Sequence, residues 1–277
     1  MAPNDEPMDS AKPGDSDEAF WREFLTRGDP GERRTRRVFK HLPHGPRCKL
    51  CAAPFAGPTA PVMRAIGKRQ ALKNPSVCNA CFDFMEKHHG GAEIDGSYLF
   101  ADIRGSTSLA ERLSPADFRS LIDRFYKVAS RAVFDNDGGV DKFVGDEIVA
   151  FFFPLLSGDD HAAKAVVTAL AILRATGHEN PEGPWVPVGI GFSSGLAWVG
   201  AVGDEKRTDL TALGDTVNIA ARLAAAARAG EVLLTVEAAR AANLDPGLGR
   251  RSLDLKGKST PTAVVSLTVG GVPAVPT

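Results

Sequence analysis

From residue 98 onward, short apolar runs alternate with longer segments whose apolar residues recur at helical spacing. The run 98–101 predicts a strand that ends on Asp102, and apolar positions three and four residues apart between 118 and 133 predict a helix. Further strands are predicted at 140–144, 147–153, 188–192, 196–202, 231–235, 250–255 and 263–269, with helices at 159–176 and 214–222 and a polar arm at 203–209. This order predicts an α+β fold: a mainly antiparallel sheet with helices on one face, similar to a ferredoxin-like core with additions.

The first 45 residues have a different character. Residues 1–17 are polar and rich in Pro, Asp, Ser and Gly, which predicts a disordered lead. Residues 18–45 predict a short helix followed by a basic linker. The helix has one apolar face, which either packs on the neighbouring module or makes a dimer or regulatory contact, and it consists of Phe20, Trp21, Phe24 and Leu25. The basic run is expected to be solvated surface, with nucleic-acid contact as the minority alternative, and it consists of Arg33, Arg34, Arg36, Arg37 and Lys40.

Length and cysteine placement divide the remainder of the chain into two parts. At 277 residues the chain is longer than one typical domain. Residues 46–91 hold all four cysteines and are predicted to form a small metal-binding module, hereafter the Cys module. Residues 92–269 hold the alternating strands and helices and form the larger domain, and residues 270–277 are predicted to be a loose tail.

Composition narrows the class of protein. A formal net charge of −1 argues against a globally basic nucleic-acid binder. No apolar run reaches the roughly 18–20 residues that cross a bilayer, and the polar, acidic start does not resemble a secretion signal. We therefore expect a soluble, cytoplasmic protein without a membrane partner. In a reducing compartment, cysteines serve metal binding or redox chemistry more often than structural disulfides.

The cysteines form two knuckles, Cys48-x-x-Cys51 and Cys78-x-x-Cys81, separated by 26 residues. Each knuckle lets two thiolates bind one tetrahedral ion, and two knuckles complete a closed four-cysteine site. This pattern favours one structural zinc ion per chain. An iron–sulfur centre, a dithiol redox switch and unligated thiols are the alternatives. His88 and His89 are either extra ligands or, in the favoured interpretation, an exposed linker pair.

Two aspartates are placed for a second kind of metal chemistry. Asp102 lies at the tip of a predicted strand, and Asp146 lies at the bend of a predicted hairpin. Carboxylates without neighbouring His or Cys suit hard divalent ions such as Mg²⁺. The turn through Gly105, Ser106 and Thr107 offers backbone N–H groups to a phosphate.

Polar or cationic side chains also stand on otherwise apolar segments, namely Lys142, Asn218, Arg222 and Lys256. Together with two divalent ions and a phosphate cradle, these groups suit displacement at phosphorus. The residues alone leave polymerase, cyclase and phosphohydrolase open.

Four blocks of sequence resemble the class III nucleotidyl cyclases. Residues 99–107, LFADIRGST, are similar to the metal-binding strand and turn of that family, and residues 142–147, KFVGDE, to its second metal motif. Residues 214–223, GDTVNIAARL, resemble its transition-state helix, and residues 255–258, LKGK, its phosphate-contacting lysine segment. The blocks occur in the order of the family, so the resemblance implies a class III cyclase core.

The resemblance also implies roles for individual residues. Asp102 and Asp146, with Ile103 beside the first, would hold two Mg²⁺ or Mn²⁺ ions that activate the ribose 3′-hydroxyl for attack on the α-phosphate. Asn218 would orient the ribose, and Arg222 would stabilise charge on the α-phosphate in the transition state. Lys256 would bind the terminal phosphates. In the family, the amide and guanidinium come from one subunit and the aspartates from the other, which implies a head-to-tail homodimer with two composite sites.

Base selection rests on two positions. Lys142 would donate a hydrogen bond to adenine N1, and Thr211 stands where many relatives carry an aspartate that accepts from the adenine amino group. The expected substrate is therefore ATP, and the expected product is cyclic AMP. A guanylyl or pyrimidine nucleotide cyclase of the same fold is the enzymatic alternative. Gly189 departs from the family, because some relatives carry an arginine near it that helps to hold the triphosphate.

A hypothesis of a different class is a zinc module that binds nucleic acid through residues 33–40, joined to a nucleotide-sensing domain without turnover. The persistence of both aspartates, Asn218 and Arg222 makes this alternative the weaker one.

Overall fold

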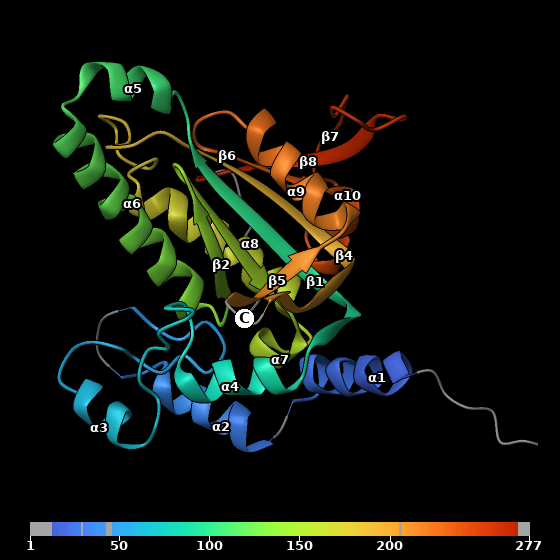
Figure 1. Cartoon of the computed structure of the whole chain (residues 1–277). Helices are drawn as coiled ribbons and strands as arrows, with labels where there is room; N and C mark the ends of the chain where they lie inside the picture. The colour runs from blue at the N-terminus through green and yellow to red at the C-terminus, as the bar shows by residue number, and fades with distance from the viewer. Residues whose placement is uncertain (1–12, 29, 43–45, 205–206, 271–277) are drawn as a thin grey trace, which may run out of the picture.

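The computed structural model describes residues 13–28, 30–42, 46–204 and 207–270, and Figure 1 shows how their elements are arranged. The strands belong to one sheet and comprise β1 (Gly90–Ile103), β2 (Gly139–Val144), β3 (Glu147–Phe152), β4 (Val188–Asp204), β5 (Arg207–Leu213), β6 (Glu231–Thr235), β7 (Arg250–Leu253) and β8 (Thr262–Thr268). Their order across the sheet is β2-β3-β1-β4-β6-β8-β7, and β5 pairs with β4 beside this path. Among these residues the paired strands are antiparallel except β4 with β6. The predicted α+β fold class is confirmed.

The helices of the described ranges are α1 (Pro13–Thr26), α2 (Pro30–Phe39), α3 (Ala60–Ala65), α4 (Asn79–Lys87), α5 (Ser106–Arg112), α6 (Pro115–Asp135), α7 (Pro154–Ser157), α8 (His161–Ala175), α9 (Asp215–Ala226) and α10 (Val236–Ala241). Apolar residues of α6, α8 and α10 pack on one face of the sheet, against residues such as Leu99 and Ala150. The intervening residues, such as Phe100 and Phe151, point to the opposite face. There they meet α9 and the N-terminal region, whose helices α1 to α4 gather at one end of the sheet in Figure 1. The expectation of helices on one face only is therefore wrong, because both faces of the sheet are apolar and each is covered.

The aromatic face of α1 packs against its neighbours. Trp21 and Leu25 are fully buried, in the same apolar cluster as Ile94 of β1. Phe20 is partly exposed, and its ring stacks on that of His88 with centroids 4.5 Å apart. Packing on the neighbouring module, one of the two predicted uses of this face, is therefore confirmed.

The N-terminal region is more helical than its composition indicates. α1 begins at Pro13, inside the predicted lead, and α2 runs through the segment predicted to be a basic linker. Arg36 is buried, which corrects the expectation of a solvated run. Its guanidinium donates to the carbonyl oxygens of Leu50 and of Gly138, the latter at 2.8 Å. Burial of this charge is possible because those carbonyls replace water around it.

The predicted polar arm at 203–209 is also wrong. β4 is continuous from Val188 to Asp204, where two strands were predicted, because β1 pairs with it along its length from Ile103↔Val188 to Gly90↔Ala201. The chain then turns back as β5, which pairs with β4 from Asp204↔Arg207 to Trp198↔Leu213. The polar Asp209 is compatible with this hairpin because its carboxylate contacts Lys49 and Asn74 of the Cys module.

One glycine sets the distance between α9 and the sheet. A Cβ atom on Gly191 of β4 would lie 2.0 Å from the backbone nitrogen of Ala224 and 2.1 Å from the carbonyl oxygen of Ala220, both on α9. Such contacts are far shorter than atoms tolerate, so only glycine lets the helix approach this closely. The helix that carries Asn218 and Arg222 is thereby held against the centre of the sheet.

Residues 1–12 of the predicted lead, 43–45 of the predicted linker and 271–277 of the predicted tail lie outside the described residues. Within the described ranges, no helix has the length and hydropathy that crossing a bilayer requires.

Candidate functional site

The structure brings Asp102 and Asp146 to adjacent strands. Asp102 lies near the end of β1, paired with Glu147 of β3, and the backbone N–H of Ile103 donates to the carbonyl oxygen of Asp146 at 3.4 Å. The bend between β2 and β3 is made by Gly145, which adopts φ = +62°, a left-handed conformation that favours glycine. Both carboxylates are therefore carried at one rim of a rigid sheet.

The donors at this rim fit a hard divalent ion. Asp102 and Asp146 offer carboxylate oxygens and are partly exposed. The side chain of Ile103 is apolar and buried, so its own contribution to a metal ion would come from its backbone carbonyl oxygen. Asp102 and Asp146 do not belong to the cysteine group, which is the cluster of potential sulfur ligands in the described part of the chain.

Two further charged residues belong to this rim, and sequence reasoning gave them no role. Arg104 forms an ion pair with Asp102 and donates to the carbonyl oxygen of Ala225 at 3.0 Å. A Cβ atom on Gly189 would lie 3.2 Å from Cδ of Arg104. Arg104 thus places a cation next to the position where some relatives carry an arginine. The sequence signal that could have identified Arg104 was its position two residues after Asp102.

Glu147 is the second of these residues. Burial, and then the neighbouring charge of Asp146, raise the pKa of Glu147 to about 7, although Arg104 opposes the shift. Tyr126 packs beside this rim. Its hydroxyl donates to the carbonyl oxygen of Gly145, and its ring stacks on that of Phe143 with centroids 4.2 Å apart.

Gly105, Ser106 and Thr107 lie directly after this rim. Gly105 is the N-cap of α5 with φ = +68°, and no side chain caps the helix start. The N–H groups of the first turn have no partner within the helix, and they follow directly on the strand that carries Asp102. This is the place that the phosphate cradle was expected to occupy.

Asn218 and Arg222 stand one turn apart on α9. Asn218 is exposed and Arg222 is partly buried. A Cβ atom on Gly257 would lie 3.2 Å from Nη2 of Arg222, which places the guanidinium beside the loop that carries the exposed Lys256. Among the contacts of the described residues, none joins Asn218 or Arg222 to Asp102 or Asp146. α9 nevertheless lies beside the rim, because Arg104 contacts both Asp102 and the carbonyl oxygen of Ala225.

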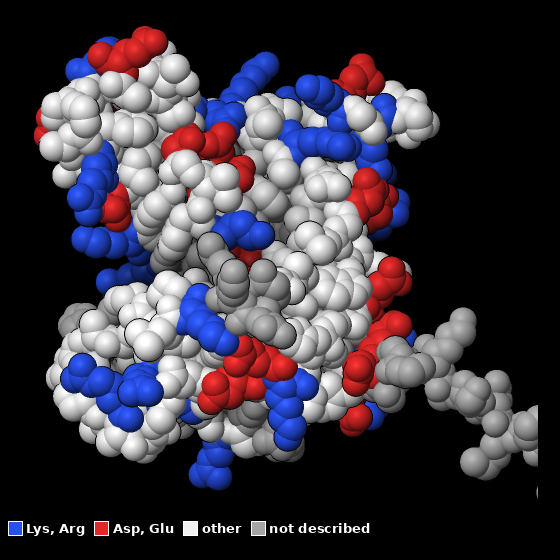
Figure 2. Space-filling model, in the orientation of Figure 1, with Lys and Arg blue, Asp and Glu red and all other residues white. Residues whose placement is uncertain are grey.

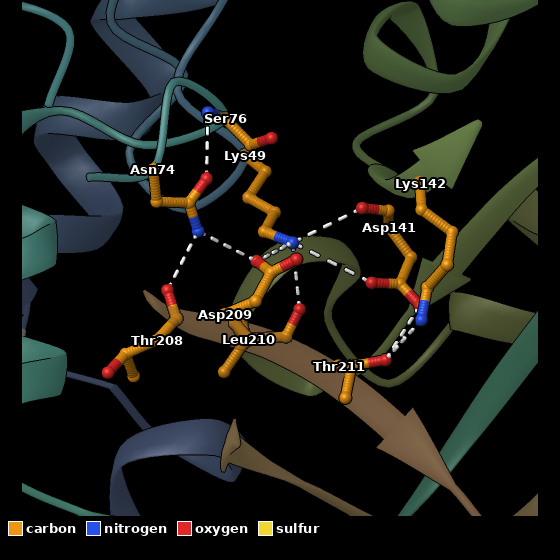
Figure 3. Close-up of polar contacts among 9 residues, drawn as sticks. All are labelled: Lys49, Asn74, Ser76, Asp141, Lys142, Thr208, Asp209, Leu210 and Thr211. Carbon is orange, nitrogen blue, oxygen red and sulfur yellow. Dashed lines mark hydrogen bonds and ion pairs between the residues drawn. The ribbon is translucent and has the colours of Figure 1, made fainter. Parts of the chain in front are cut away.

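The predicted base-selecting residues contact each other. Nζ of Lys142, on β2, donates to Oγ1 of Thr211, on β5, at 2.9 Å. The hydroxyl of Thr211 in turn donates to Oδ2 of Asp141 at 2.9 Å, and Lys142 lies 3.3 Å from the same oxygen. Figure 3 shows this arrangement. Burial raises the pKa of Asp141, while the charges of Lys49 and Lys142 and the hydrogen bond from Thr211 act to lower it.

The four cysteine sulfurs converge as their spacing predicts. All four Sγ atoms lie within 4.8 Å of one another, and those of Cys51 and Cys78 are 3.7 Å apart. Zn–S bonds of about 2.3 Å in tetrahedral geometry place sulfurs about 3.8 Å apart, so the group is of the right size for one metal ion. His88 and His89 are outside the cluster. His89 is exposed as expected, whereas His88 is the C-cap of α4 and its ring stacks on that of Phe20, so it is not part of an exposed linker.

The thiols of this cluster also polarise one another. Burial acts to raise the pKa of Cys48, but hydrogen bonds from the other three thiols outweigh it and bring the pKa well below the usual value. A thiolate within a closed set of sulfurs is the form that binds a metal.

Comparisons with known proteins agree with this geometry. The family model described as the adenylate and guanylate cyclase catalytic domain matches residues 94–265. An adenylate cyclase of Anabaena cylindrica is 32% identical over 134 residues, which are 45% of this chain and 26% of that protein. The chain thus spans about a quarter of the length of this curated relative.

Two solved structures share the fold at 27% identity. The guanylyl cyclase Cya2 superposes with a TM-score of 0.60 over 66% of this chain and 95% of its own. The adenylyl cyclase CyaB from P. aeruginosa gives 0.56 over 64% and 94%.

Proposed function

The chain belongs to the family of adenylate and guanylate cyclase catalytic domains, and from this premise we propose that it converts ATP into 3′,5′-cyclic AMP and pyrophosphate. In this reaction the ribose 3′-oxygen bonds to the α-phosphorus, and the bond from that phosphorus to the bridging oxygen breaks as pyrophosphate leaves. Two Mg²⁺ or Mn²⁺ ions, when bound, would supply activation of the 3′-hydroxyl and neutralisation of phosphate charge. Asp102 and Asp146, with the carbonyl oxygen of Ile103, would hold them.

The chain's other groups bind and orient the substrate in this proposal. Backbone N–H groups at Gly105, Ser106 and Thr107 would bind a phosphate. The amide of Asn218 would orient the ribose, and the guanidinium of Arg222 would stabilise charge that develops on the α-phosphate. Lys256 would hold the terminal phosphates.

The observation that carries the choice of ATP is the hydrogen bonding between Lys142 and Thr211. An ammonium group has three donors. Lys142 directs one to Thr211 and forms an ion pair with Asp141 at 3.3 Å, so it keeps a donor for a ligand. A hydroxyl has one donor and two acceptor positions. Thr211 donates a hydrogen bond to Asp141 and accepts one from Lys142, which leaves one acceptor position.

The pair therefore offers a ligand a donor beside an acceptor. Adenine presents an acceptor at N1 beside a donor at its amino group, so it matches both positions. In the same pose guanine presents the opposite pattern, a donor at N1 beside an acceptor at O6, and would leave both groups unpaired.

The proposed site is shared between two chains. Because Asn218 and Arg222 make no contact with the aspartates among the described residues, we propose that a second copy of the chain brings its aspartates to them. Apolar side chains next to the base-selecting pair are exposed and would be covered by that copy, among them Phe143 and Val144 of β2 and Leu213 of β5. The resulting head-to-tail homodimer has two equivalent sites.

The test of the function is an assay of all four common ribonucleoside triphosphates with Mn²⁺, in which both pyrophosphate and the cyclised nucleotide are measured. We expect cyclic AMP from ATP and, for GTP, about a tenth of that rate or less. If the chain turns over GTP or a pyrimidine nucleotide faster than ATP, that nucleotide is the substrate instead. A folded protein that releases neither product would contradict the function as a whole.

Zinc in the Cys module is a second part of the proposal. We expect the freshly purified chain to carry about one zinc ion, because four converging thiols form a closed tetrahedral set. Metal analysis by plasma mass spectrometry checks this. A coloured preparation that contains iron would instead assign the cluster to an iron–sulfur centre, and a metal-free one to a dithiol switch. Four unbridged cysteines also suit a reducing, cytoplasmic compartment.

The nucleic-acid alternative has less support than the enzyme. Of the basic run at 33–40, Arg36 is buried and Lys40 forms an ion pair with Asp137 at 2.7 Å. Lys and Arg side chains on the face seen in Figure 2 are scattered over several elements rather than gathered into one basic surface. A broad basic surface is what affinity for the phosphate backbone requires.

A further inference from the structure

A lysine of the Cys module is buried inside the larger domain. Lys49 follows Cys48 directly in sequence, and its side chain is only 2% exposed. Its Nζ lies 2.5 Å from Oδ1 of Asp209 and donates to the carbonyl oxygen of Leu210 at 2.8 Å and to that of Asp141 at 3.2 Å. Figure 3 shows the ammonium group of Lys49 between Asp141 and Asp209.

Asp141 connects this lysine to the base-selecting pair. Its Oδ2 takes the hydrogen bond from Thr211 and faces Lys142. Its Oδ1 is buried without a hydrogen-bond partner among the described residues, and the ammonium of Lys49 lies 3.6 Å from it. A buried carboxylate needs a nearby cation to stay ionised. Lys49 is the better buried of the two lysines that face it, because 45% of the Lys142 side chain is exposed.

The backbone of Lys49 is fixed by the Cys module. Its N–H donates to the carbonyl oxygen of Ser76 at 3.0 Å, which ties the first knuckle to the loop before the second. In that loop, Asn74 donates to the carbonyl oxygen of Thr208 at 2.9 Å and to Oδ1 of Asp209 at 3.0 Å. The Cys module therefore contacts β5 through two side chains, within a few residues of Thr211.

We propose that Lys49 is a positioning residue for base recognition, so that the Cys module is a structural part of the nucleotide-selecting site. Lys49 stabilises Asp141 as a carboxylate, which accepts the hydrogen bond from the Thr211 hydroxyl. The oxygen of that hydroxyl is then left as an acceptor for the adenine amino group. This inference rests on the proposed function, because it concerns how that function selects its base.

Loss of Lys49 has a definite consequence for selectivity. Asp141 would lie buried with one cation fewer and would tend to take up a proton. A protonated Asp141 donates to Thr211, which frees the Thr211 proton for an acceptor such as guanine O6. Discrimination between the two purines should then fall while the phosphate contacts remain.

Equilibrium binding tests this link without requiring turnover. Full-length Lys49→Met is compared with wild type by calorimetry, using α,β-methylene ATP and α,β-methylene GTP in the presence of Mg²⁺. We expect the ratio of the two dissociation constants to shift about tenfold toward GTP, the worth of one hydrogen bond. Zinc content and far-UV circular dichroism should match wild type.

Lys68→Met is the matched control. Lys68 is a partly buried lysine of the same module, and the charges of all four thiols act on it. Within the described residues, it makes no hydrogen bond or ion pair with the larger domain through its side chain. We expect its ratio of dissociation constants to equal that of wild type. A ratio that moves equally in both variants would overturn the proposal in favour of a general effect of charge near the cysteines.

Asp141→Asn removes the carboxylate that links Lys49 to Thr211, and it does so from the larger domain. It should shift the ratio in the same direction, and the double variant with Lys49→Met should add little, because both changes remove one linkage. A folded, zinc-loaded Lys49→Met chain with the wild-type ratio contradicts the inference. If Lys49→Met does not fold, Asp141→Asn decides, and an unchanged ratio there overturns it.

The outcomes separate this inference from the proposed function. A wild-type chain that binds the GTP analogue more tightly refutes the choice of ATP. A ratio that still moves in Lys49→Met but not in Lys68→Met would nevertheless support the role of Lys49.

Discussion

Asp102→Ala or Asp146→Ala is expected to lower the rate of cyclic AMP formation about a thousandfold or more, with the dimer intact. Each change removes a carboxylate that the proposal assigns to the divalent ions, and such ions supply several kcal/mol of stabilisation to charge in the transition state. Both aspartates are partly exposed at the rim of the sheet, so their loss leaves no cavity in the core. The rate is measured at saturating Mn²⁺, and the mass of the assembly by light scattering.

Asp135→Ala provides the control for loss of a carboxylate. Asp135 is exposed at the end of α6, and its ion pair is with Arg131 on the same helix at 3.5 Å. Its activity should stay within about twofold of wild type, as is usual for exposed positions away from a site. Substantial activity in either of the other two variants, at the same metal concentration, would show that the carboxylates do not hold the catalytic ions.

Much of the fold could be predicted because the sequence pattern there is local. The apolar run before Asp102 and the alternation around Asp146 each identify a strand from neighbouring residues alone. The two strands prove to be neighbours in the sheet, where Asp102 pairs with Glu147, the residue after Asp146. The spacing of the two cysteine knuckles likewise led to the convergence of the four sulfurs.

The failures concern residues whose partners are distant in sequence. Arg36 was expected at the surface because its neighbours are basic, but its acceptor at Gly138 lies 102 residues away. Lys49 was given no role, and its acceptor at Leu210 lies 161 residues away. Polarity alone cannot distinguish a solvated charge from a buried and satisfied one. For the same reason, the polar residues of β5 were predicted to be an arm rather than a strand.

These long-range contacts change the interpretation of the Cys module. A basic linker and an independent metal module would allow the N-terminal region to move freely relative to the larger domain. Instead, Arg36 contacts the residue that precedes β2, and Lys49 contacts both β2 and β5. The two strands that carry Lys142 and Thr211 are therefore held from the same side.

Mixing two inactive variants is expected to restore activity. Asp102→Ala and Arg222→Ala remove groups that the proposal assigns to opposite sides of each site. In a mixed dimer, one site carries both defects and the other carries neither. With free exchange of subunits from equal amounts, half of the dimers are mixed, so about a quarter of the sites are intact. The rate per chain should approach that fraction of the wild-type rate, measured after incubation long enough for exchange.

The control for mixing uses two changes on the same side of the site. Asp102→Ala mixed with Asp146→Ala should remain inactive, because every site then receives its aspartates from a defective chain. Exchange itself is followed by energy transfer between differently labelled chains. If exchange is complete and Asp102→Ala with Arg222→Ala stays inactive, each chain builds its own site. Activity in the control mixture would instead mean that the aspartates of one site come from different chains. Because the two mixtures differ only in which second residue is removed, their comparison isolates the sharing of a site from subunit association.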